Sequence, residues 1–360
     1  MSEYLLLVFE VCVGVQLLYF LLYAVVIGKH KRKVHKSDIP VSVVVCARNE
    51  LFNLKSNLPF LLSQDYENYE VIVVNDRSTD GTYEYLYDLK HQHANFKLVQ
   101  VDTVPDHINS KKYAITLGIK AAKYKKLLFT DADCIPNSSL WVQEMASQKS
   151  FVLGVSLYQK RKGLLNLFVR FETYLTAMQY IGNALLGKPY MGVGRNLGYD
   201  KNIFIDNKGF NHLQGIVGGD DDLFVNQYIA RKNHEIVIGK NALVYSIPKT
   251  TVSSFFIQKI RHMWVGKYYK FSDKLVLGIF SLSFILFWIS GGGLLFFSPD
   301  VVLIGYLGRL LVMWLLFFIV SKRFGERFVP LILPLLDFLY LFYYISVGTI
   351  AVLSKKVRWS

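Results

Sequence analysis

The chain has 360 residues, of which 52% are apolar, and it carries a formal net charge of +14. This length allows one large domain together with membrane segments, and the apolar excess lies at the two ends of the chain. Much of the positive charge sits directly beside apolar runs, which is typical of membrane proteins and argues against a nucleic-acid partner. Three cysteines without a Cys-x-x-Cys pair predict neither a disulfide framework nor a zinc site, as suits a reducing cytosol.

Residues 4–27 form an apolar run with a single charge, Glu10. The run is too long for the core of a signal peptide, so we expect an uncleaved membrane anchor. A basic cluster at residues 30–33 follows it directly, and such clusters stay on the cytoplasmic side. The sequence therefore predicts an outside N-terminus and a cytoplasmic domain after the anchor.

The middle of the chain alternates short apolar runs with amphipathic stretches, which favours a doubly wound α/β sheet. The apolar runs are rich in Val, Ile and Leu, as expected of buried parallel strands. Ligands of such sheets bind at the carboxyl ends of the strands. The predicted strands cover residues 41–46, 70–75, 96–101 and 126–130, and the predicted helices cover residues 50–63, 82–91 and 112–122.

Residues 252–270 mix aromatic and basic side chains at helical spacing, which predicts a helix lying in the membrane interface. Three apolar segments follow, at residues 275–297, 301–320 and 328–353. We expect three spans. The last segment contains two prolines and Asp337, and a full third crossing would place the basic C-terminus outside, so a broken or re-entrant segment is the alternative.

Acidic side chains follow several of the predicted strands. Asp131-Ala132-Asp133 ends the fourth strand, and two such carboxylates suit Mg²⁺ or Mn²⁺ together with phosphate oxygens. The alternative is a turn former and helix cap ahead of Pro136. The run from Asp76 to Asp80 after the second strand likewise fits either a capped βα loop or a contact to a base or ribose.

Two later stretches are also candidates. The acidic run Asp220, Asp221 and Asp222 fits either an exposed helix N-terminus or the general base of a transferase. The glycine-rich stretch around Arg195 and Asn196 has the wrong spacing for a dinucleotide loop, but it can bring backbone amides and Arg195 near an acceptor or phosphate group.

Seven stretches carry a resemblance to a known family: PVSVVVCARNE, YEVIVVNDRSTDGT, SKKYAITLGI, LLFTDADC, GVGRNLGY, GGDDDLF and QKIRHMW. They run from about residue 40 to residue 270. In this order they resemble the inverting family 2 glycosyltransferases of the GT-A fold, the group that contains cellulose, chitin and hyaluronan synthases and bacterial surface-polysaccharide transferases. The resemblance implies an α/β fold with a doubly wound, mostly parallel sheet, one N-terminal and about three C-terminal transmembrane helices.

The resemblance also implies roles for individual residues. Asp220 would be the catalytic base, because it aligns with the aspartate of the family's Glu-Asp element. Asp133, together with Asp131, would coordinate Mg²⁺ or Mn²⁺. The residues implied in binding the nucleotide sugar are Ala47, Arg48, Glu50, Asp76, Lys111, Lys112, Asp131, Gln258 and Arg261.

The chain departs from the family pattern at two positions. Gly219 replaces the glutamate usually found before the base, which leaves the choice between Asp220 and Asp221 open. His262 stands where the family's Gln-x-x-Arg-Trp motif has tryptophan, and the nearest tryptophan is Trp264. Because processive synthases hold the acceptor sugar with that tryptophan, long-chain extension is not expected.

The expected organisation is therefore a transmembrane anchor, a GT-A domain, an amphipathic interfacial helix and C-terminal transmembrane segments, at residues 4–27, 40–250, 252–272 and 275–353. We expect a metal-dependent, hexosyltransferase-type enzyme that uses a nucleotide-diphosphate sugar, UDP-type favoured. Its acceptor would be lipid-linked or a polysaccharide, in cell-surface glycan synthesis. Membrane lipids are expected partners, and nucleic acid is not. We expect a multi-pass protein of the cell inner (plasma) membrane with a cytoplasmic catalytic domain.

Two other interpretations are a catalytically degenerate membrane scaffold and a nucleotidyltransferase. The retained acidic and basic motif residues argue against the scaffold. Residues 43–54 lack the glycine-rich signature that a nucleotidyltransferase would carry near its first strand.

Overall fold

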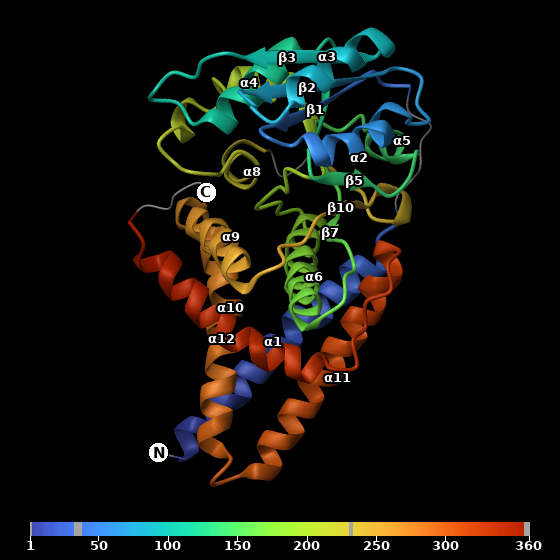
Figure 1. Ribbon diagram of the computed structural model, residues 1–360. Helices are drawn as coiled ribbons and strands as arrows, with labels where there is room; N and C mark the ends of the chain where they lie inside the picture. The colour runs from blue at the N-terminus through green and yellow to red at the C-terminus, as the bar shows by residue number, and fades with distance from the viewer. Residues whose placement is uncertain (1, 32–37, 230–232, 356–360) are drawn as a thin grey trace. The chain divides into compact units, whose positions relative to one another are not determined.

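The computed structural model describes residues 2–31, 38–229 and 233–355, and these fall into two compact units. Of the described residues, those up to His30 and those from Thr251 to Lys355 form the membrane unit. The chain between them, from Lys31 to Thr250, forms the α/β unit (Figure 1).

The main sheet of the α/β unit has, within the described residues, seven strands in the order β3-β2-β1-β4-β8-β6-β9. The first four in this order are parallel, and β8 runs antiparallel to both of its neighbours. The predicted mostly parallel α/β sheet is thus confirmed. The strands are β1 (Val41–Ala47), β2 (Tyr69–Asp76), β3 (Phe96–Val101), β4 (Lys126–Asp131), β6 (Phe151–Leu153), β8 (Leu197–Asp200) and β9 (His234–Ile236).

A second, three-stranded sheet has the order β5-β10-β7. Its strands are β5 (Cys134–Pro136), β7 (Ser156–Tyr158) and β10 (Val244–Ser246). Because only Ala132 and Asp133 separate β4 from β5, Asp133 sits at the junction between the two sheets.

The helices of the α/β unit include the three that the sequence predicts, with ends shifted by one or two residues. The long helix α6 was not predicted. The helices are α2 (Leu51–Leu62), α3 (Thr82–Gln92), α4 (Ser110–Ala121), α5 (Trp141–Met145), α6 (Leu164–Leu185), α7 (Lys201–Asp206) and α8 (Asp222–Tyr228), with 3-10 turns η1 (Asn211–Leu213) and η2 (Lys240–Ala242).

The core of the α/β unit packs β1 and β2 against apolar faces of the flanking helices. Val43 and Val45 are fully buried beside Leu58 of α2. Burying one such aliphatic side chain stabilises the fold by about 1.5–3 kcal/mol. Trp141 is also fully buried, and its indole N–H donates to the Asn196 side chain at 3.0 Å. The carboxyl ends of β1 and β4 are therefore held on a rigid base.

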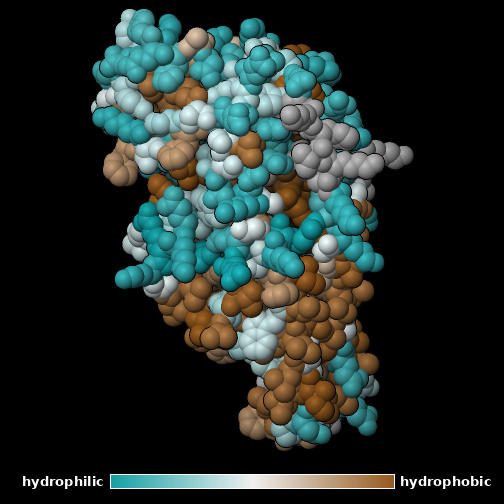
Figure 2. All heavy atoms as spheres, turned by 90° about the vertical axis from the view of Figure 1, so that its right-hand side faces the viewer, coloured by the Kyte–Doolittle hydropathy of each residue, from teal (hydrophilic) through white to brown (hydrophobic). Residues whose placement is uncertain are grey.

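The membrane unit contains, among the described residues, four helices long and apolar enough to cross a membrane. This agrees with the predicted one N-terminal and three C-terminal helices, and Figure 2 shows hydrophobic side chains gathered over this unit. They are α1 (Ser2–Lys29), α10 (Phe271–Leu294), α11 (Pro299–Phe324) and α12 (Leu333–Leu353). Helix α9 (Val252–Val265) and turn η3 (Gly266–Tyr268) precede α10, and the interfacial position of α9 stays a prediction.

A polar cluster lies inside the membrane unit. Arg309 donates two hydrogen bonds to Asp337, at 2.6 and 3.1 Å, and both side chains are buried. Arg309 also donates to Gln16 at 3.4 Å, and the Gln16 amide donates to Phe280 O and Ser283 Oγ of α10. A charge inside a membrane bundle needs such partners. The sequence analysis noted Asp337 but did not foresee its pairing with Arg309.

Replacing Gly198 with alanine should destabilise the α/β unit. A Cβ on Gly198 would lie 2.5 Å from the carbonyl oxygen of Leu127 and 2.9 Å from Val152, so β8 would have to move away from its neighbours. We expect a loss of about 1–3 kcal/mol, the usual effect of overpacking. Thermal unfolding of the purified full chain in detergent measures it, with Gly215→Ala as control, because nothing lies within 4 Å of a Cβ there. Equal unfolding temperatures for the two variants would contradict this reading.

Candidate active site

A pocket lies at the carboxyl ends of β1 and β4. These two strands are neighbours, and the connections from them leave in opposite directions, which is where open α/β sheets bind ligands. Apolar side chains line part of the pocket. Its other lining residues are Cys46, Lys111, Thr130, Asp131, Gly194, Tyr199, Asp220 and Asp221.

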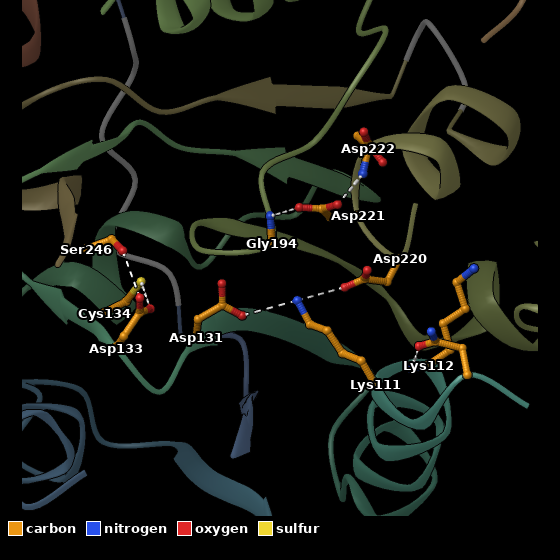
Figure 3. Close-up of polar contacts among 11 residues, drawn as sticks. Lys111, Lys112, Asp131, Asp133, Cys134, Gly194, Asp220, Asp221, Asp222 and Ser246 are labelled. Carbon is orange, nitrogen blue, oxygen red and sulfur yellow. Dashed lines mark hydrogen bonds and ion pairs between the residues drawn. The ribbon is translucent and has the colours of Figure 1, made fainter. Parts of the chain in front are cut away.

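Lys111 joins two of these carboxylates (Figure 3). Its Nζ lies 3.0 Å from Asp220 Oδ2 and 3.5 Å from Asp131 Oδ1. Burial alone would lower the pKa of Lys111, but the surrounding aspartates outweigh it and hold that pKa well above its usual value. Burial would likewise raise the pKa of Asp220, yet Lys111 outweighs this and the pKa is lowered. The pocket therefore holds a protonated Lys111 beside the ionised carboxylate of Asp220.

Asp221 points away from Lys111 and ties two loops together (Figure 3). Its Oδ2 accepts from the Gly194 amide at 2.6 Å, and its Oδ1 accepts from the Asp222 amide at 2.8 Å. Asp221 is also the N-cap of α8. Burial, followed by the charge of Asp220, raises the pKa of Asp221. The structure thus gives the two aspartates different surroundings, with Asp220 facing the pocket and Asp221 holding its wall.

Asp133 is held by the second sheet. Its Oδ2 accepts from Ser246 Oγ at 3.1 Å, and its Oδ1 accepts from the Cys134 thiol at 3.3 Å. Burial, and then the charge of Asp131, raises the pKa of Asp133. The sequence analysis missed Ser246, which follows 113 residues later and carries no local signal.

The residues around Asp133 fit a hard divalent cation. Ligand atoms of Asp131, Asp133 and Cys134 lie within 4.8 Å of one another. Burial raises the pKa of the Cys134 thiol well above its usual value, so sulfur stays protonated and is a poor ligand. Two carboxylates that repel each other remain, and oxygen donors of this kind suit Mg²⁺ or Mn²⁺.

The loops after β1 and β2 are bonded to each other. Asn49 Oδ1 accepts from the Thr79 amide at 2.8 Å, and Asp80 accepts from the Leu51 amide at 3.0 Å. Asp80 also accepts from the Thr82 amide and hydroxyl, although the N-cap of α3 is Gly81. Asn49 and Arg77 both have φ of 55°, a conformation that costs energy in a non-glycine residue and is common at functional sites.

The other residues implied near the nucleotide lie around these loops. Ala47 ends β1 and is buried, while Arg48 is exposed. Glu50 accepts from the Asn53 amide at 2.6 Å. Asp76 is buried and pairs with Arg77 Nε at 2.8 Å.

Three predicted residues are engaged in the protein's own packing. Lys112 donates to the carbonyls of Leu213 and Ile216, away from Lys111. The Asn196 amide donates to two backbone carbonyls at 2.8 Å and accepts from Trp141. The Arg195 guanidinium lies 4.7 Å from the centre of the Tyr158 ring, and its charge acts on Asp133.

Gln258 and Arg261 lie on α9, in the membrane unit. These two residues therefore belong to a different unit from the residues that line the pocket.

The chain matches two related protein families. It matches the family described as glycosyl transferase family 2 over residues 42–203, and the one described as glycosyl transferase family group 2 over residues 131–354. The second match covers more than half of the chain. The protein therefore belongs to the family 2 glycosyltransferases.

Individual relatives agree with this family. The chain is 33% identical over 101 residues to poly-β-1,6-N-acetyl-D-glucosamine synthase of Staphylococcus epidermidis, a match that covers 28% of this chain and 23% of that protein. It is 34% identical over 107 residues to an uncharacterized glycosyltransferase of Haemophilus influenzae, covering 30% and 32% of the two chains. The matches thus span about a quarter to a third of the length of these curated relatives.

A solved structure shares the fold. It is the mannosyltransferase PcManGT from Pyrobaculum calidifontis in complex with GDP-Man and Mn²⁺, with a TM-score of 0.64 and 16% sequence identity. The alignment covers 99% of this chain and 100% of that one. The predicted GT-A fold with membrane helices is thereby confirmed.

Asp221→Ala should loosen the wall of the pocket, because it leaves the Gly194 amide without an acceptor and removes the cap of α8. We expect a loss of about 1–3 kcal/mol in stability, the effect of an unsatisfied amide together with a lost N-cap. Asp221→Asn keeps a side-chain oxygen and should lose less. Thermal unfolding of both variants checks the order, and an alanine variant as stable as the parent would count against this role.

Proposed function

We propose that this glycosyltransferase is an inverting, metal-dependent enzyme that moves a sugar from a nucleotide-diphosphate sugar to a membrane-associated acceptor. The observation that carries the proposal is the meeting of Asp131, Lys111 and Asp220 in one pocket at the carboxyl edge of the sheet. One carboxylate there is suited to the donor side and the other to the acceptor side, with a cation between them.

Asp220 is the catalytic base of the proposed reaction. Its carboxylate takes the proton from the acceptor hydroxyl as that oxygen attacks the anomeric carbon. The bond from the anomeric carbon to the diphosphate oxygen breaks at the same time on the opposite face, so one displacement inverts the configuration. Asp221 is the weaker candidate, because both of its oxygens already accept backbone amides.

Negative charge develops on the departing diphosphate, and the chain has groups suited to bind it. Lys111 stands at the pocket, and the charge of Arg195, from the loop before β8, acts on Asp133 and Asp131. Asp133 and Asp131 would hold Mg²⁺ or Mn²⁺, which offsets the charge on the leaving group when bound. Mn²⁺ and GDP-Man accompany the solved mannosyltransferase of the same fold, which supports a donor of this class, and the residues around Asp76 are the proposed contact for a uracil-type base.

The membrane unit points to a membrane-associated acceptor. Four apolar helices suggest a multi-pass protein, and the relatives from Staphylococcus epidermidis are synthases of poly-β-1,6-N-acetyl-D-glucosamine. We propose a lipid-linked or glycan acceptor at the inner (plasma) membrane, with the catalytic domain in the cytoplasm. The basic residues that follow α1 support this orientation.

Asp220→Asn should abolish transfer while it spares donor binding, because the amide keeps the shape of the side chain but cannot take a proton. A fall of about 10²–10⁴-fold in turnover is expected for loss of a general base. Turnover and donor affinity are measured side by side, with Asp221→Asn as the matched control that should keep most of the activity. Near-normal turnover of Asp220→Asn would sink the assignment.

Asp133→Ala should remove metal binding and metal-stimulated activity together. Binding of Mn²⁺ to the purified protein, followed by electron paramagnetic resonance, measures the first without any need for turnover. Asp102→Ala removes an exposed carboxylate and serves as the control. Unchanged Mn²⁺ affinity in Asp133→Ala would show that the cation binds elsewhere.

A further inference from the structure

The chain that follows α11 runs back along the helix it has just left. Ser321 Oγ accepts from the Phe328 amide at 2.6 Å, and the ring of Phe328 lies 6.1 Å from that of Phe317. Asp337 then reaches Arg309, which lies about 22 Å from the end of α11 at 1.5 Å per residue. The segment between α11 and α12 therefore returns from the end of α11 to the middle of the helix bundle.

Helix α12 then packs antiparallel to α10. As residue numbers rise along α12, the partners on α10 fall in number toward the beginning of that helix. The pairs are Phe338 with Trp288 at 5.3 Å between ring centres, Tyr340 with Phe284 at 5.5 Å, and Tyr344 with Ser281 through their hydroxyls.

The end of α12 lies beside the segment that precedes α10. The Trp264 indole donates to Ser354 O at 2.9 Å, and Lys267 Nζ donates to Val352 O and Ser354 O at 2.8 and 2.9 Å. Because α10 begins at Phe271, these contacts place the end of α12 at the beginning of α10 (Figure 1). A helix that crossed completely would end beside the turn between α10 and α11 instead.

Helix α1 shows on which side of the membrane unit α10 begins and α12 ends. Tyr19 donates to Val276 O near the beginning of α10, whereas Phe9 stacks on Phe287 farther along. The two helices are therefore antiparallel, and the end of α1 at Lys29 lies on the side where α10 begins. The α/β unit follows α1 in the chain and precedes α9, so the chain enters and leaves that unit from this same side.

We infer that α12 is a re-entrant helix, pinned at mid-depth by the Arg309–Asp337 ion pair, and that it forms the support on which α9 lies. The chain then crosses the membrane with α1, α10 and α11 and returns its C-terminus to the side of the α/β unit. This arrangement puts Lys355 with the other basic residues and removes the conflict that a full crossing of α12 has with the positive-inside rule.

The ion pair is built to fix the start of α12 in depth. Arg309 and Asp337 are each 1% exposed, and the Arg309 guanidinium lies 4.8–5.4 Å from the centres of three phenylalanine rings, those of Phe20, Phe284 and Phe287. Either charge alone would be left buried without its partner, which is strongly unfavourable. Moving α12 toward the far side of the bundle would break this pair.

Helix α12 in turn contacts α9. The Tyr343 ring stacks on Phe255 at 5.6 Å, and a Cβ on Gly348 would lie 3.6 Å from the Met263 side chain. Helix α9 also carries Gln258 and Arg261. The family resemblance implies that these two bind the nucleotide sugar, so on the proposed function Arg309 and Asp337 are positioning residues that act through α12 and α9.

Cysteine labelling tests the path of α12. The Lys355→Cys variant is placed in sealed membrane vesicles of known orientation and treated with a membrane-impermeant maleimide. Lys123→Cys in the α/β unit and Ser298→Cys at the α10–α11 turn mark the two sides of the membrane. The chain without an added cysteine is the blank. We expect Lys355→Cys to label from the same side as Lys123→Cys. Labelling from the side of Ser298→Cys would overturn the re-entrant path. The assay needs no catalysis, so its failure is distinct from failure of the proposed function.

Removing the charges of Arg309 and Asp337 tests whether this ion pair holds α12 in place. Arg309→Met and Asp337→Leu should each lose the one-sided labelling of Lys355→Cys and raise the donor KM more than they lower kcat. The double variant buries no unpaired charge and should recover both, since apolar replacement of a buried pair is often neutral. Lys322→Met, which removes an exposed charge from α11, is the control. Single variants that match the control, or a double variant as impaired as the singles, would refute the role of the pair.

Discussion

The site depends on one interaction, the salt bridge of Lys111 with Asp220 and Asp131. The three residues come from α4, from the loop before α8 and from the end of β4, so the contact joins segments that are far apart in the chain. Two carboxylates at a sheet edge repel each other when both are charged, and the ammonium group between them offsets that repulsion. On the proposed function, the same arrangement keeps an ionised base and a positive charge beside the departing diphosphate.

The rest of the α/β unit serves to hold this arrangement. Asp221 fixes the loop that carries Gly194, Asn196 fixes the same loop to the core through Trp141, and Ser246 fixes Asp133 from the second sheet. Each pair of neighbouring aspartates is thereby divided. Asp220 faces the pocket while Asp221 holds its wall, and Asp131 faces Lys111 while Asp133 turns to Ser246. Small differences in hydrogen bonding thus give adjacent carboxylates different tasks.

The sequence predicts most strands of the parallel sheet and several site residues. It misses the features that depend on contacts between residues far apart in the chain. Runs of Val, Ile and Leu predict β1, β2 and β4, and the position of Asp131 at a strand end follows from the pattern. The different surroundings of Asp220 and Asp221 do not follow from it, because Asp221 bonds the Gly194 amide 27 residues away. Lys112 and Asn196 are polar, yet the fold uses them for buried carbonyls. Helix α6, which is largely buried, was not predicted from the sequence, and the pairing of Arg309 with Asp337 becomes visible only in the structure.

The most direct measurement is the product of a single turnover with defined donors. Purified protein in lipid is given UDP-, GDP- and dTDP-sugars with Mn²⁺ or Mg²⁺, and the released nucleotide and the new glycosidic bond are both analysed. The account predicts release of a nucleoside diphosphate, only with metal, and an anomeric configuration opposite to that of the donor. A retained configuration, or release of a nucleoside monophosphate, would contradict direct displacement assisted by Asp220.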